Sequence, residues 1–495
     1  MQTSDSRALT DLPCVDSGLI DSLWRHARQR PNAEAVGEVD GARRTCTYRE
    51  LAGQVAARAR RLIGSVAPGQ VVIAVLPAGI DYIAWFYASI AAGVKFLPLH
   101  TQIAGPEALA ISKRVGAVAA IVSPGLAAEP ALRHLAMDVC EEARLGRSGP
   151  RLSRESAGAV VLGSSGTMGM PKLVLRSSTS LDADAAGVIA GMGLTAGDRV
   201  VFATPLSHSY GVDVLVSVVA AGATLRVMSR FDSEVLAQEM EGGATILLGV
   251  PFIFEALARR PRRQAVGLRL ALSAGSPLSA RVRREFIDAW AVQVGQLYGA
   301  TELGTVAMGV PGSEGFDAES VGRPLTGVSM RVVDLADPQR TLETGQEGQL
   351  AVHASSMLSR YLDADLCLVD GHLLTGDLAK IDTEGRVWIT GRLKLLIDVG
   401  AYKVNPLEVE SVICTHPSVA ECVVVPLSAS ETLQRLRAVV VLQESGHAAT
   451  AEALRQFLRE RLSPIKVPRV IEFAASLPKS PTGKVLRDQV IGRTT

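Results

Sequence analysis

Residues 160–177, VVLGSSGTMGMPKLVLRS, place glycines, serines and a threonine directly after an apolar run, and Lys172 follows. Glycines let the backbone approach a ligand closely, and N–H groups, hydroxyls and a lysine are suitable donors to phosphate oxygens. The stretch does not match GxxxxGK[ST], because Lys172 follows Pro171 and precedes Leu173, which excludes the P-loop of nucleoside triphosphatases. It also lacks the second glycine of GxSxG around Ser165, which excludes a nucleophile elbow. A phosphate-binding loop of another kind and a plain surface loop both remain.

The elements that would position such a loop show a regular alternation. Short β-branched runs end in Gly, Pro or Ser, and longer Ala- and Arg-rich segments separate them. In SARVRREFIDAW, the residues Val282, Phe286 and Trp290 recur at helical spacing. Strands that alternate with helices predict parallel sheets covered on both faces. The runs are VVIAVLPAG, VAAIVS, RVVFATPLS and GATILLGVP.

The pattern changes from about Gly322, where short strands separated by turns, such as SMRVVDLAD and GRVWITGR, predict an antiparallel subdomain. After Arg392 a smaller α/β pattern precedes a Pro-rich tail. The predicted fold class is therefore α/β. A large N-terminal domain, 1–391, would hold two βα-type sheet subdomains and a small antiparallel β-subdomain, and 392–495 would form a small C-terminal α+β domain.

Bulk properties exclude several classes of protein. The 495 residues exceed one hydrophobic core, and a formal net charge of +1 argues against a nucleic-acid binder. The first residues contain no apolar signal core, and no apolar run reaches the roughly 18 residues of a membrane span. The 6 cysteines show no CxxC pairing and no metal-ligand spacing, so we expect buried reduced thiols. The expectation is a cytoplasmic protein without nucleic-acid or membrane partners.

SSGTMGMPK resembles the phosphate loop of the adenylate-forming superfamily, which contains acyl- and aryl-CoA synthetases, peptide-synthetase adenylation domains and beetle luciferases. A single motif could arise by chance. Several further motifs of the superfamily occur here in the expected order over most of the chain, which together favour membership. They are TYREL, TPLSHSYGV, LSAGSPLS, QLYGATELG, LLTGDLAKID, ITGRLK, VNPLEVE and PKSPTGKVLR.

The resemblance implies a role for each matching residue. Tyr298 would stack near adenine, Thr301 would contact the α-phosphate, and Glu302 would bind Mg²⁺. Asp377 and Arg392 would hold the ribose. The nucleotide-binding set for ATP is then Ser164, Ser165, Gly166, Thr167, Gly169, Lys172, Gly275, Ser276, Pro277, Gln296, Tyr298, Gly299, Thr301, Asp377 and Arg392.

The superfamily's catalytic lysine matches Lys484, and the resemblance adds His208 and Thr301 to the catalytic set. Its C-terminal domain rotates about a hinge that matches Lys394, so that Lys484 is present in one orientation and withdrawn in the other. The acceptor channel would pass Gly400 and Ala401. The acid pocket would be lined by His208, Ser209, Tyr210, Gly211, Phe252, Ala274, Gly275 and Ala300.

Each assignment has a structural alternative. Glu302 could cap a helix and Asp377 could close a turn. His208 could be a satisfied core histidine, Lys484 a solvated surface lysine, and the aromatic residues Tyr210 and Phe252 could simply pack in the core.

Three positions depart from the superfamily pattern. Met168 replaces a threonine of the phosphate loop, which predicts weaker ATP binding. Ala401 replaces a glycine beside the pantetheine channel, where a methyl group would narrow the channel. Ser209 stands where domains specific for α-amino acids usually carry an aspartate. An α-ammonium group would lack a counter-charge there, which favours an aryl or other acid without an α-amino group.

The predicted activity is an ATP-dependent ligase that forms an acyl- or aryl-adenylate and passes the acyl group to coenzyme A or to the phosphopantetheine of an acyl carrier protein, in secondary metabolism. ATP and Mg²⁺ are the expected cofactors. An amide synthetase that hands the acyl group to an amine is an alternative within the same chemistry. A nucleotide sensor without catalysis is an alternative of another class, against which the retained Lys484 argues.

Overall fold

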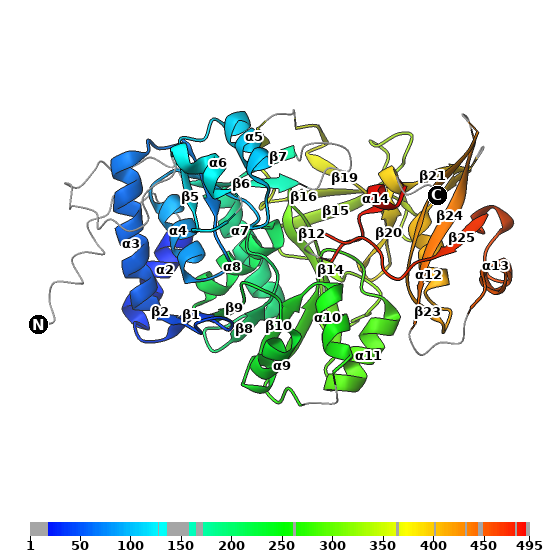
Figure 1. Ribbon diagram of the computed structural model, residues 1–495, viewed down its shortest axis with the longest axis horizontal. Coiled ribbons are helices and arrows are strands. Elements are labelled where there is room, and N and C mark those ends of the chain that lie inside the picture. The colour runs from blue at the N-terminus through cyan, green and yellow to red at the C-terminus, as the bar shows by residue number, and fades with distance from the viewer. Residues whose placement is uncertain are drawn as a thin grey trace, which may run out of the picture.

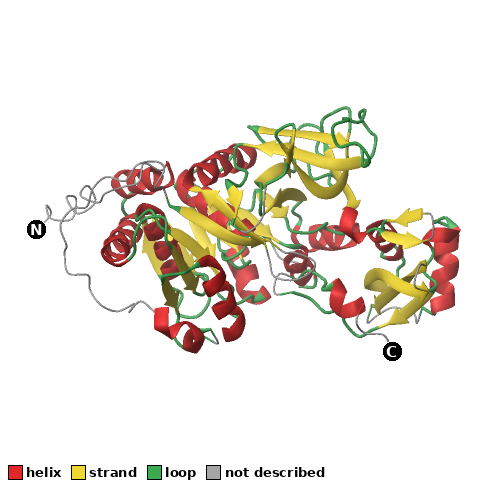
Figure 2. Cartoon of the chain, turned by 90° about the horizontal axis from the view of Figure 1, so that it is seen from above, coloured by secondary structure: helices red, strands yellow, loops and turns green. Residues whose placement is uncertain are grey.

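A computed structural model describes residues 18–126, 128–135, 158–164, 172–260, 264–362, 366–399, 402–430, 433–443, 449–480 and 483–491. Most of these residues form a large unit, and the elements from β21 onward form a smaller unit at one end of the molecule (Figure 1). Figure 2 shows the smaller unit from above, beside the large one. The α/β fold class predicted from sequence is confirmed.

Two mixed sheets form the centre of the large unit. Within the described residues, one sheet has nine strands in the order β14-β13-β12-β11-β10-β8-β9-β1-β2, and the other has six in the order β17-β7-β6-β4-β3-β5. The first comprises β1 (Glu34–Glu38), β2 (Thr45–Thr47), β8 (Arg199–Phe202), β9 (Thr224–Val227), β10 (Ile246–Gly249), β11 (Leu270–Ser273), β12 (Val294–Ala300), β13 (Gly304–Gly309) and β14 (Arg323–Pro324). The second comprises β3 (Val71–Val75), β4 (Lys95–Pro98), β5 (Ala119–Val122), β6 (Ala159–Ser164), β7 (Lys172–Ser177) and β17 (Arg360–Tyr361).

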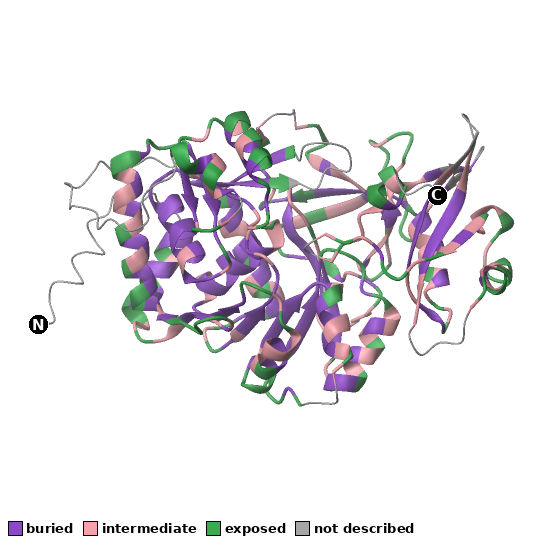
Figure 3. Cartoon of the chain, viewed as in Figure 1, coloured by how far each residue is buried: buried purple, intermediate pink, exposed green. Residues whose placement is uncertain are grey.

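Helices cover both faces of each sheet, as the alternating sequence predicts. Among the described residues, five helices lie between the two sheets and share one hydrophobic core with them: α2 (Gly18–Gln29), α3 (Tyr48–Ser65), α4 (Ile80–Ala91), α7 (Ser178–Met192) and α8 (Ser209–Ala221). The outer face of the nine-stranded sheet carries α9 (Ser233–Glu241), α10 (Pro251–Ala258) and α11 (Ala280–Trp290), and the outer face of the six-stranded sheet carries α5 (Gly105–Val115) and α6 (Glu129–Leu132), which a short 3₁₀ turn (Arg133–Leu135) follows. Figure 3 shows the contrast between the buried inner layer and the outer helices, which expose one face.

Helix composition explains these positions. The inner helix α4 buries almost every residue, because apolar sheets lie on both sides of it. The outer helix α11 buries Val282, Phe286 and Trp290 on one face, as their spacing predicts, and its arginines remain on the other. The helix α3 begins with a capping box in which Thr47 and Glu50 each accept from the other's backbone.

The antiparallel subdomain has five strands among the described residues: β15 (Val328–Val333), β16 (Gly348–Ala354), β18 (Leu368–Val369), β19 (His372–Ile381) and β20 (Val387–Arg392). It is less separate than the change of pattern near Gly322 suggests. The short strand β14 still pairs with β13, and β17 extends the six-stranded sheet by pairing with β7. Both strands have two residues, and each covers the edge of one of the two mixed sheets.

The smaller unit contains a two-stranded and a three-stranded sheet, each within the described residues. Its strands are β21 (Ile397–Val399), β22 (Tyr402–Val404), β23 (Val419–Ser430), β24 (Leu433–Leu442) and β25 (Val470–Phe473). Its helices are α12 (Pro406–Ile413), α13 (Ala451–Arg459) and α14 (Arg487–Ile491), with 3₁₀ turns at Leu393–Leu395 before it and Pro464–Lys466 within it. It has its own apolar core, separate from those of the large unit.

The cysteines depart in part from the sequence prediction. All four described cysteines carry free thiols, and Cys46 and Cys422 are buried as expected. However, Cys367 is exposed and Cys414 is only partly covered, so the prediction of buried thiols was wrong for Cys367. The reason is its position just before the two-residue edge strand β18.

A buried ionic cluster ties the two sheets together. Arg176, fully buried on β7, donates from Nη1 to Asp213 of α8 at 2.6 Å and from Nη2 to Asp184 of α7 at 3.0 Å. Asp184 also accepts from the backbone N–H of Thr305, at the start of β13, at 3.0 Å. The cluster therefore joins the β6–β7 hairpin, the inner helices and the β12–β13 hairpin.

This cluster predicts a large loss of stability on removal of its cation. Arg176→Met retains a long side chain but leaves two carboxylates buried, so the free energy of unfolding should fall by about 3–5 kcal/mol. The exposed pair of Arg340 with Asp334 provides a control, because Arg340→Met should cost about 0–1 kcal/mol. Urea denaturation would measure both variants. Equal losses would contradict the role assigned to Arg176.

Candidate functional site

The predicted site residues collect at one edge of the nine-stranded sheet. The strands β8, β10, β11 and β12 are parallel to one another, so their carboxyl ends meet at the same edge. The chain leaves β8 toward His208, leaves β11 into residues 274–277, and leaves β12 toward Glu302. In open α/β sheets ligands bind at this edge.

The turn predicted to contact adenine follows β11. Gly275 has φ of +83°, a left-handed conformation that favours glycine. Its neighbour Ala274 donates from its backbone N–H to the carbonyl of Gly249 at 2.9 Å, which holds the turn against the start of α10. Gln296 accepts from the N–H of Leu278 at 3.2 Å and donates to the carbonyl of Ala318 at 2.9 Å. Both ends of the buried Gln296 amide thus hold protein backbone in place.

Tyr298, Asp377 and Arg392 form one hydrogen-bonded group, although they come from three strands. Asp377 on β19 lies directly opposite Arg392 on β20 in the sheet register. Arg392 Nε donates to Asp377 Oδ1 at 2.6 Å, and the Tyr298 hydroxyl donates to Asp377 Oδ2 at 2.6 Å. Burial and the nearby Asp377 raise the pKa of Tyr298, so the phenol stays protonated and remains a donor. The group presents a carboxylate and a guanidinium beside the carboxyl end of β12.

Glu302 and Lys172 both contact Tyr361. Tyr361 on β17 donates its hydroxyl to Glu302 Oε1 at 3.2 Å. The Lys172 ammonium lies 5.0 Å from the centre of the Tyr361 ring, within range of a cation–π contact. Burial and the Glu302 carboxylate raise the pKa of Tyr361, so this phenol also remains a donor. Thr301 and Glu302 occupy the turn between β12 and β13, and Tyr361 relates Glu302 to Lys172, the last residue of the predicted phosphate loop.

His208 stands at the start of α8 as its N-cap residue, and its side chain makes no capping hydrogen bond. Its ring centre lies 6.2 Å from that of His100, which follows β4. Surrounding protein and the charge of His100 lower the pKa of His208 to about 4, so its imidazole is neutral at pH 7. A neutral ring beside an acid pocket adds no charge and can donate or accept one hydrogen bond.

The other predicted pocket residues follow on α8 and α10. Tyr210 packs edge-on against Phe202 at 5.2 Å between ring centres, and its buried hydroxyl has no hydrogen-bond partner among the described residues. Gly211 lies against the backbone of Leu206, so closely that a Cβ would fall 2.5 Å from the carbonyl oxygen of Pro205. Phe252 is 41% exposed at the start of α10.

Lys484 approaches this group from the smaller unit. Surrounding protein and the positive charges of Arg392 and Arg487 lower the pKa of Lys484, whereas Asp377 acts in the opposite direction. The ammonium therefore lies within electrostatic range of the Asp377–Arg392 pair. Lys394, the predicted hinge, is exposed in the 3₁₀ turn Leu393–Leu395 that follows β20. Residues more than 90 positions apart in the chain thus converge.

Part of the predicted site lies outside the described residues. That part comprises residues of the predicted phosphate loop and of the predicted acceptor channel: Ser165, Gly166, Thr167, Met168, Gly169, Gly400 and Ala401. Of Ser164 only the backbone is described, as the end of β6 paired with Lys172.

Sequence reasoning missed His100 and Tyr361. His100 follows β4, and Tyr361 lies in a two-residue strand, so neither belongs to a recognisable motif. The pairing of β17 with β7 is what brings Tyr361 beside Lys172. One signal was available for His100, since it directly follows the run KFLPL, and residues after such runs collect at a sheet edge.

Glu302 is the residue predicted to hold a metal ion. Across the described ranges, no three His, Cys, Asp or Glu side chains gather as a metal site. Mg²⁺ in nucleotide sites is usually held by one or two carboxylates together with phosphate oxygens and water. Glu302, half-buried beside Tyr361 and Lys172, fits that requirement as a single carboxylate.

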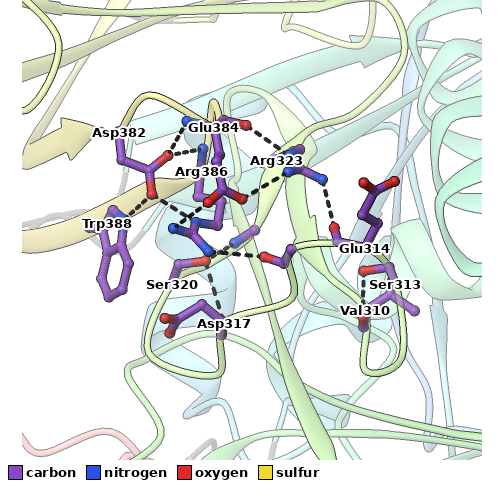
Figure 4. Close-up of polar contacts among 12 residues, drawn as sticks. Val310, Ser313, Glu314, Asp317, Ser320, Arg323, Asp382, Glu384, Arg386 and Trp388 are labelled. Carbon is purple, nitrogen blue, oxygen red and sulfur yellow. Dashed lines mark hydrogen bonds and ion pairs between the residues drawn. The ribbon is translucent and has the colours of Figure 1, made fainter.

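A separate cavity of about 310 Å³ lies beside the loop that follows β13. Arg323 donates to the carbonyls of Glu384 and Glu314 at 2.8 Å each, and Arg386 donates to Asp382 at 2.7 Å (Figure 4). These arginines tie the loop to the β19–β20 turn. Of the described residues that line the cavity, none belongs to the predicted site.

Comparisons with known proteins agree with the architecture. The model of the family described as AMP-binding enzyme matches residues 23–362, and that of the AMP-binding enzyme C-terminal domain matches 408–484. Indoleacetate–CoA ligase of Aromatoleum aromaticum is 29% identical, covering 95% of this chain and 97% of the relative. Feruloyl-CoA synthase of an Amycolatopsis species is 30% identical, covering 96% and 99%.

The fold is also shared with solved structures. The amide bond synthetase McbA from Marinactinospora thermotolerans superposes with a TM-score of 0.83 at 24% identity, covering 97% of this chain and 100% of McbA. No helix in the described segments combines the length and the apolar character needed to cross a membrane.

The lowered pKa of His208 predicts a dependence of stability on pH. Between about pH 6.5 and 4 the unfolded chain binds a proton at this histidine that the folded chain does not, so its contribution to stability falls as the pH falls. His208→Gln removes this contribution. The loss of unfolding free energy between pH 7 and pH 5 should therefore be smaller in the variant than in the parent protein.

Urea denaturation at the two pH values would measure this difference. His134→Gln is a matched control, because His134 is exposed at the end of a short helical segment and should leave the loss unchanged. An identical loss in parent and His208→Gln would contradict the burial of a neutral imidazole.

Proposed function

The chain belongs to the AMP-binding enzyme family, the adenylate-forming ligases, and on that premise we propose that it activates an aryl carboxylic acid as its adenylate and transfers the acyl group to a thiol. The observation that supports this proposal most directly is the approach of Lys484 to the Asp377–Arg392 pair. A lysine ammonium from the smaller unit lies at the edge of the sheet where ligands bind in this class of fold. A binding protein without catalysis would have no use for it there.

The reaction would join two anions. A carboxylate oxygen attacks the α-phosphorus of ATP, and pyrophosphate leaves, so the barrier arises largely from charge repulsion and orientation. Lys484 would reduce that repulsion by contacting both the carboxylate and the α-phosphate. Lys484 is exposed, so its ammonium is open to an incoming anion, while surrounding protein and the positive charge of Arg392 lower its pKa.

The nucleotide would be held by groups that the structure brings together. Asp377 and Arg392 would bind the ribose hydroxyls, with Tyr298 orienting the carboxylate of Asp377 through its hydroxyl. Lys172, with the loop that precedes it, would hold the β- and γ-phosphates. Glu302 would hold Mg²⁺, which neutralises the leaving pyrophosphate when bound.

The acid would lack an α-amino group. Ser209 offers no counter-charge for an ammonium, and His208 is neutral at pH 7. The unpartnered hydroxyl of Tyr210 could serve a polar substituent of the acid. The two relatives described above, each matched over nearly its full length, are named for indoleacetate and for feruloyl-CoA. Indoleacetate and the feruloyl group both contain an aromatic ring. An aryl acid is thus the substrate class we propose.

Coenzyme A is the acceptor that the names of these relatives favour, and the pantetheine thiol of a carrier protein offers the same chemistry. One observation favours a second candidate. Ala401 adds a methyl group where the superfamily has a glycine beside the pantetheine channel, so direct transfer to an amine is the alternative.

Lys484→Ala tests the assignment of the first half-reaction. The loss of one preorganised cation should lower acid-dependent ATP–pyrophosphate exchange about 10²–10³-fold. Thioester formation from supplied acyl-adenylate should be spared, because that step begins after the anions have joined. Lys113→Ala, on the exposed face of α5, is the control and should retain both activities. Equal losses in both half-reactions would contradict the role.

A panel of acids and acceptors tests the proposed substrates. Aryl acetates and hydroxycinnamates should support exchange, whereas α-amino acids should not. The adenylate would then be offered to coenzyme A, to a phosphopantetheinylated carrier protein and to amines. Ala401→Gly should accelerate thioester formation if the methyl group narrows the channel. Equal rates in Ala401→Gly and the parent would remove the argument for an amine acceptor, and exchange with none of the acids would contradict the proposed activity.

A further inference from the structure

The start of α10 meets the segment that carries Lys484. Gly483 lies so close to Phe252 that a Cβ built on Gly483 would fall 2.8 Å from the Cβ of Phe252 and 3.4 Å from its Cγ. In Figure 1 the red C-terminal tail runs from the smaller unit back toward the large one. Phe252 thus contacts the residue directly before the proposed catalytic lysine.

The Phe252 ring is supported by a second aromatic ring. It packs edge-on against Phe231, with 5.1 Å between ring centres, while 41% of Phe252 stays exposed. Helix α10 begins at Pro251, directly after Val250, whose side chain would contact a Cβ at Gly275 at 3.5 Å. The backbone just before Phe252 therefore packs against the turn that is predicted to contact adenine.

The lysine segment is itself a tight turn. Gly483 has φ of +78° and donates its N–H to the carbonyl of Ser480 at 2.8 Å. The Lys484 N–H donates to the Ser480 hydroxyl at 3.2 Å, and the Ser480 N–H donates to the Lys484 carbonyl at 2.8 Å. A side chain at position 483 would be strained by its φ and would meet Phe252. The glycine therefore allows the turn to lie close to Phe252.

On its own unit the tail is anchored by an ion pair. Arg487 donates from Nη1 and Nη2 to the two carboxylate oxygens of Glu410, at 2.6 Å each. This bidentate pair holds the tail to α12. Lys484 thus lies between a fixed attachment to the smaller unit and an apolar contact with the large one.

We propose that Phe252, supported by Phe231, is the positioning residue that docks the Gly483–Lys484 turn for adenylate formation. This inference rests on the proposed function, and it gives Phe252 a role different from lining the acid pocket. An apolar contact suits the task because it fixes a position without competing for the charge of Lys484, and it separates easily when the smaller unit moves.

Phe252→Ala should lower acid-dependent ATP–pyrophosphate exchange about tenfold, while thioester formation from supplied acyl-adenylate stays within about twofold of the parent. Phe252→Leu, which keeps an apolar contact, should recover most of the loss. Phe473→Ala is the matched control, because Phe473 is similarly exposed, at 44%, on β25. A Phe252→Ala variant with unchanged exchange would overturn the proposal.

A double variant separates docking from pocket lining. If Phe252 acts through Lys484, the double variant with Phe252→Ala and Lys484→Ala should lose no more exchange than Lys484→Ala alone. Multiplied losses, or a rise in the KM for the acid that depends on the size of the acid, would show that Phe252 binds the acid instead.

Amide hydrogen exchange provides a readout independent of catalysis. The hydrogen-bonded N–H groups of Ser480, Gly483 and Lys484 should exchange faster in Phe252→Ala than in the parent and in Phe473→Ala. If the parent shows no adenylation with any acid, the proposed function fails, and this measurement still decides whether Phe252 docks the turn. Equal exchange in all three proteins would overturn the docking role.

Discussion

The cross-strand pair of Asp377 and Arg392 is the interaction on which the arrangement of the site depends. It stands at the end of β20, the last strand before the chain passes to the smaller unit. Its carboxylate also accepts from Tyr298, and its charges act on Lys484. The ion pair thus joins β19 to β20 and, through Tyr298, bonds to the nine-stranded sheet, within electrostatic range of Lys484 of the smaller unit. The short contacts restrict each partner to one geometry, which a nucleotide site requires.

The fold could be predicted from sequence because its signals are local. Runs of β-branched residues ending in Gly or Pro identify strands, and the spacing of Val282, Phe286 and Trp290 identifies the buried face of α11. The edge strands β14 and β17 could not be predicted, since two residues are too few to show a periodic pattern. Their pairing depends on which edge strand of the mixed sheets has a free side. Cys367 escaped prediction for the same reason, because exposure beside a short edge strand is set by tertiary structure.

For the candidate site, motifs predicted residues but not their contacts. The motifs name Tyr298, Asp377 and Arg392 separately, and only the sheet register shows that they bond to one another. Tyr361 had no motif, although it links two predicted residues, Glu302 and Lys172. The ion pairs of the buried Arg176 could not be predicted from the sequence either. Its two carboxylate partners lie on different helices, and nothing in the spacing of the three residues indicates that they meet.

The contacts described between the two units are of a kind that permits movement. Arg281 of α11 donates to the carbonyl of Ala420 at 3.1 Å, and Asn405 donates to the carbonyl of Thr390 at 2.7 Å. Backbone carbonyls can exchange such donors for water at little net cost, because the hydrogen bonds lost are replaced. The contact of Gly483 with Phe252 is apolar and small. Contacts of this kind are compatible with the reorientation of the smaller unit that the resemblance implies.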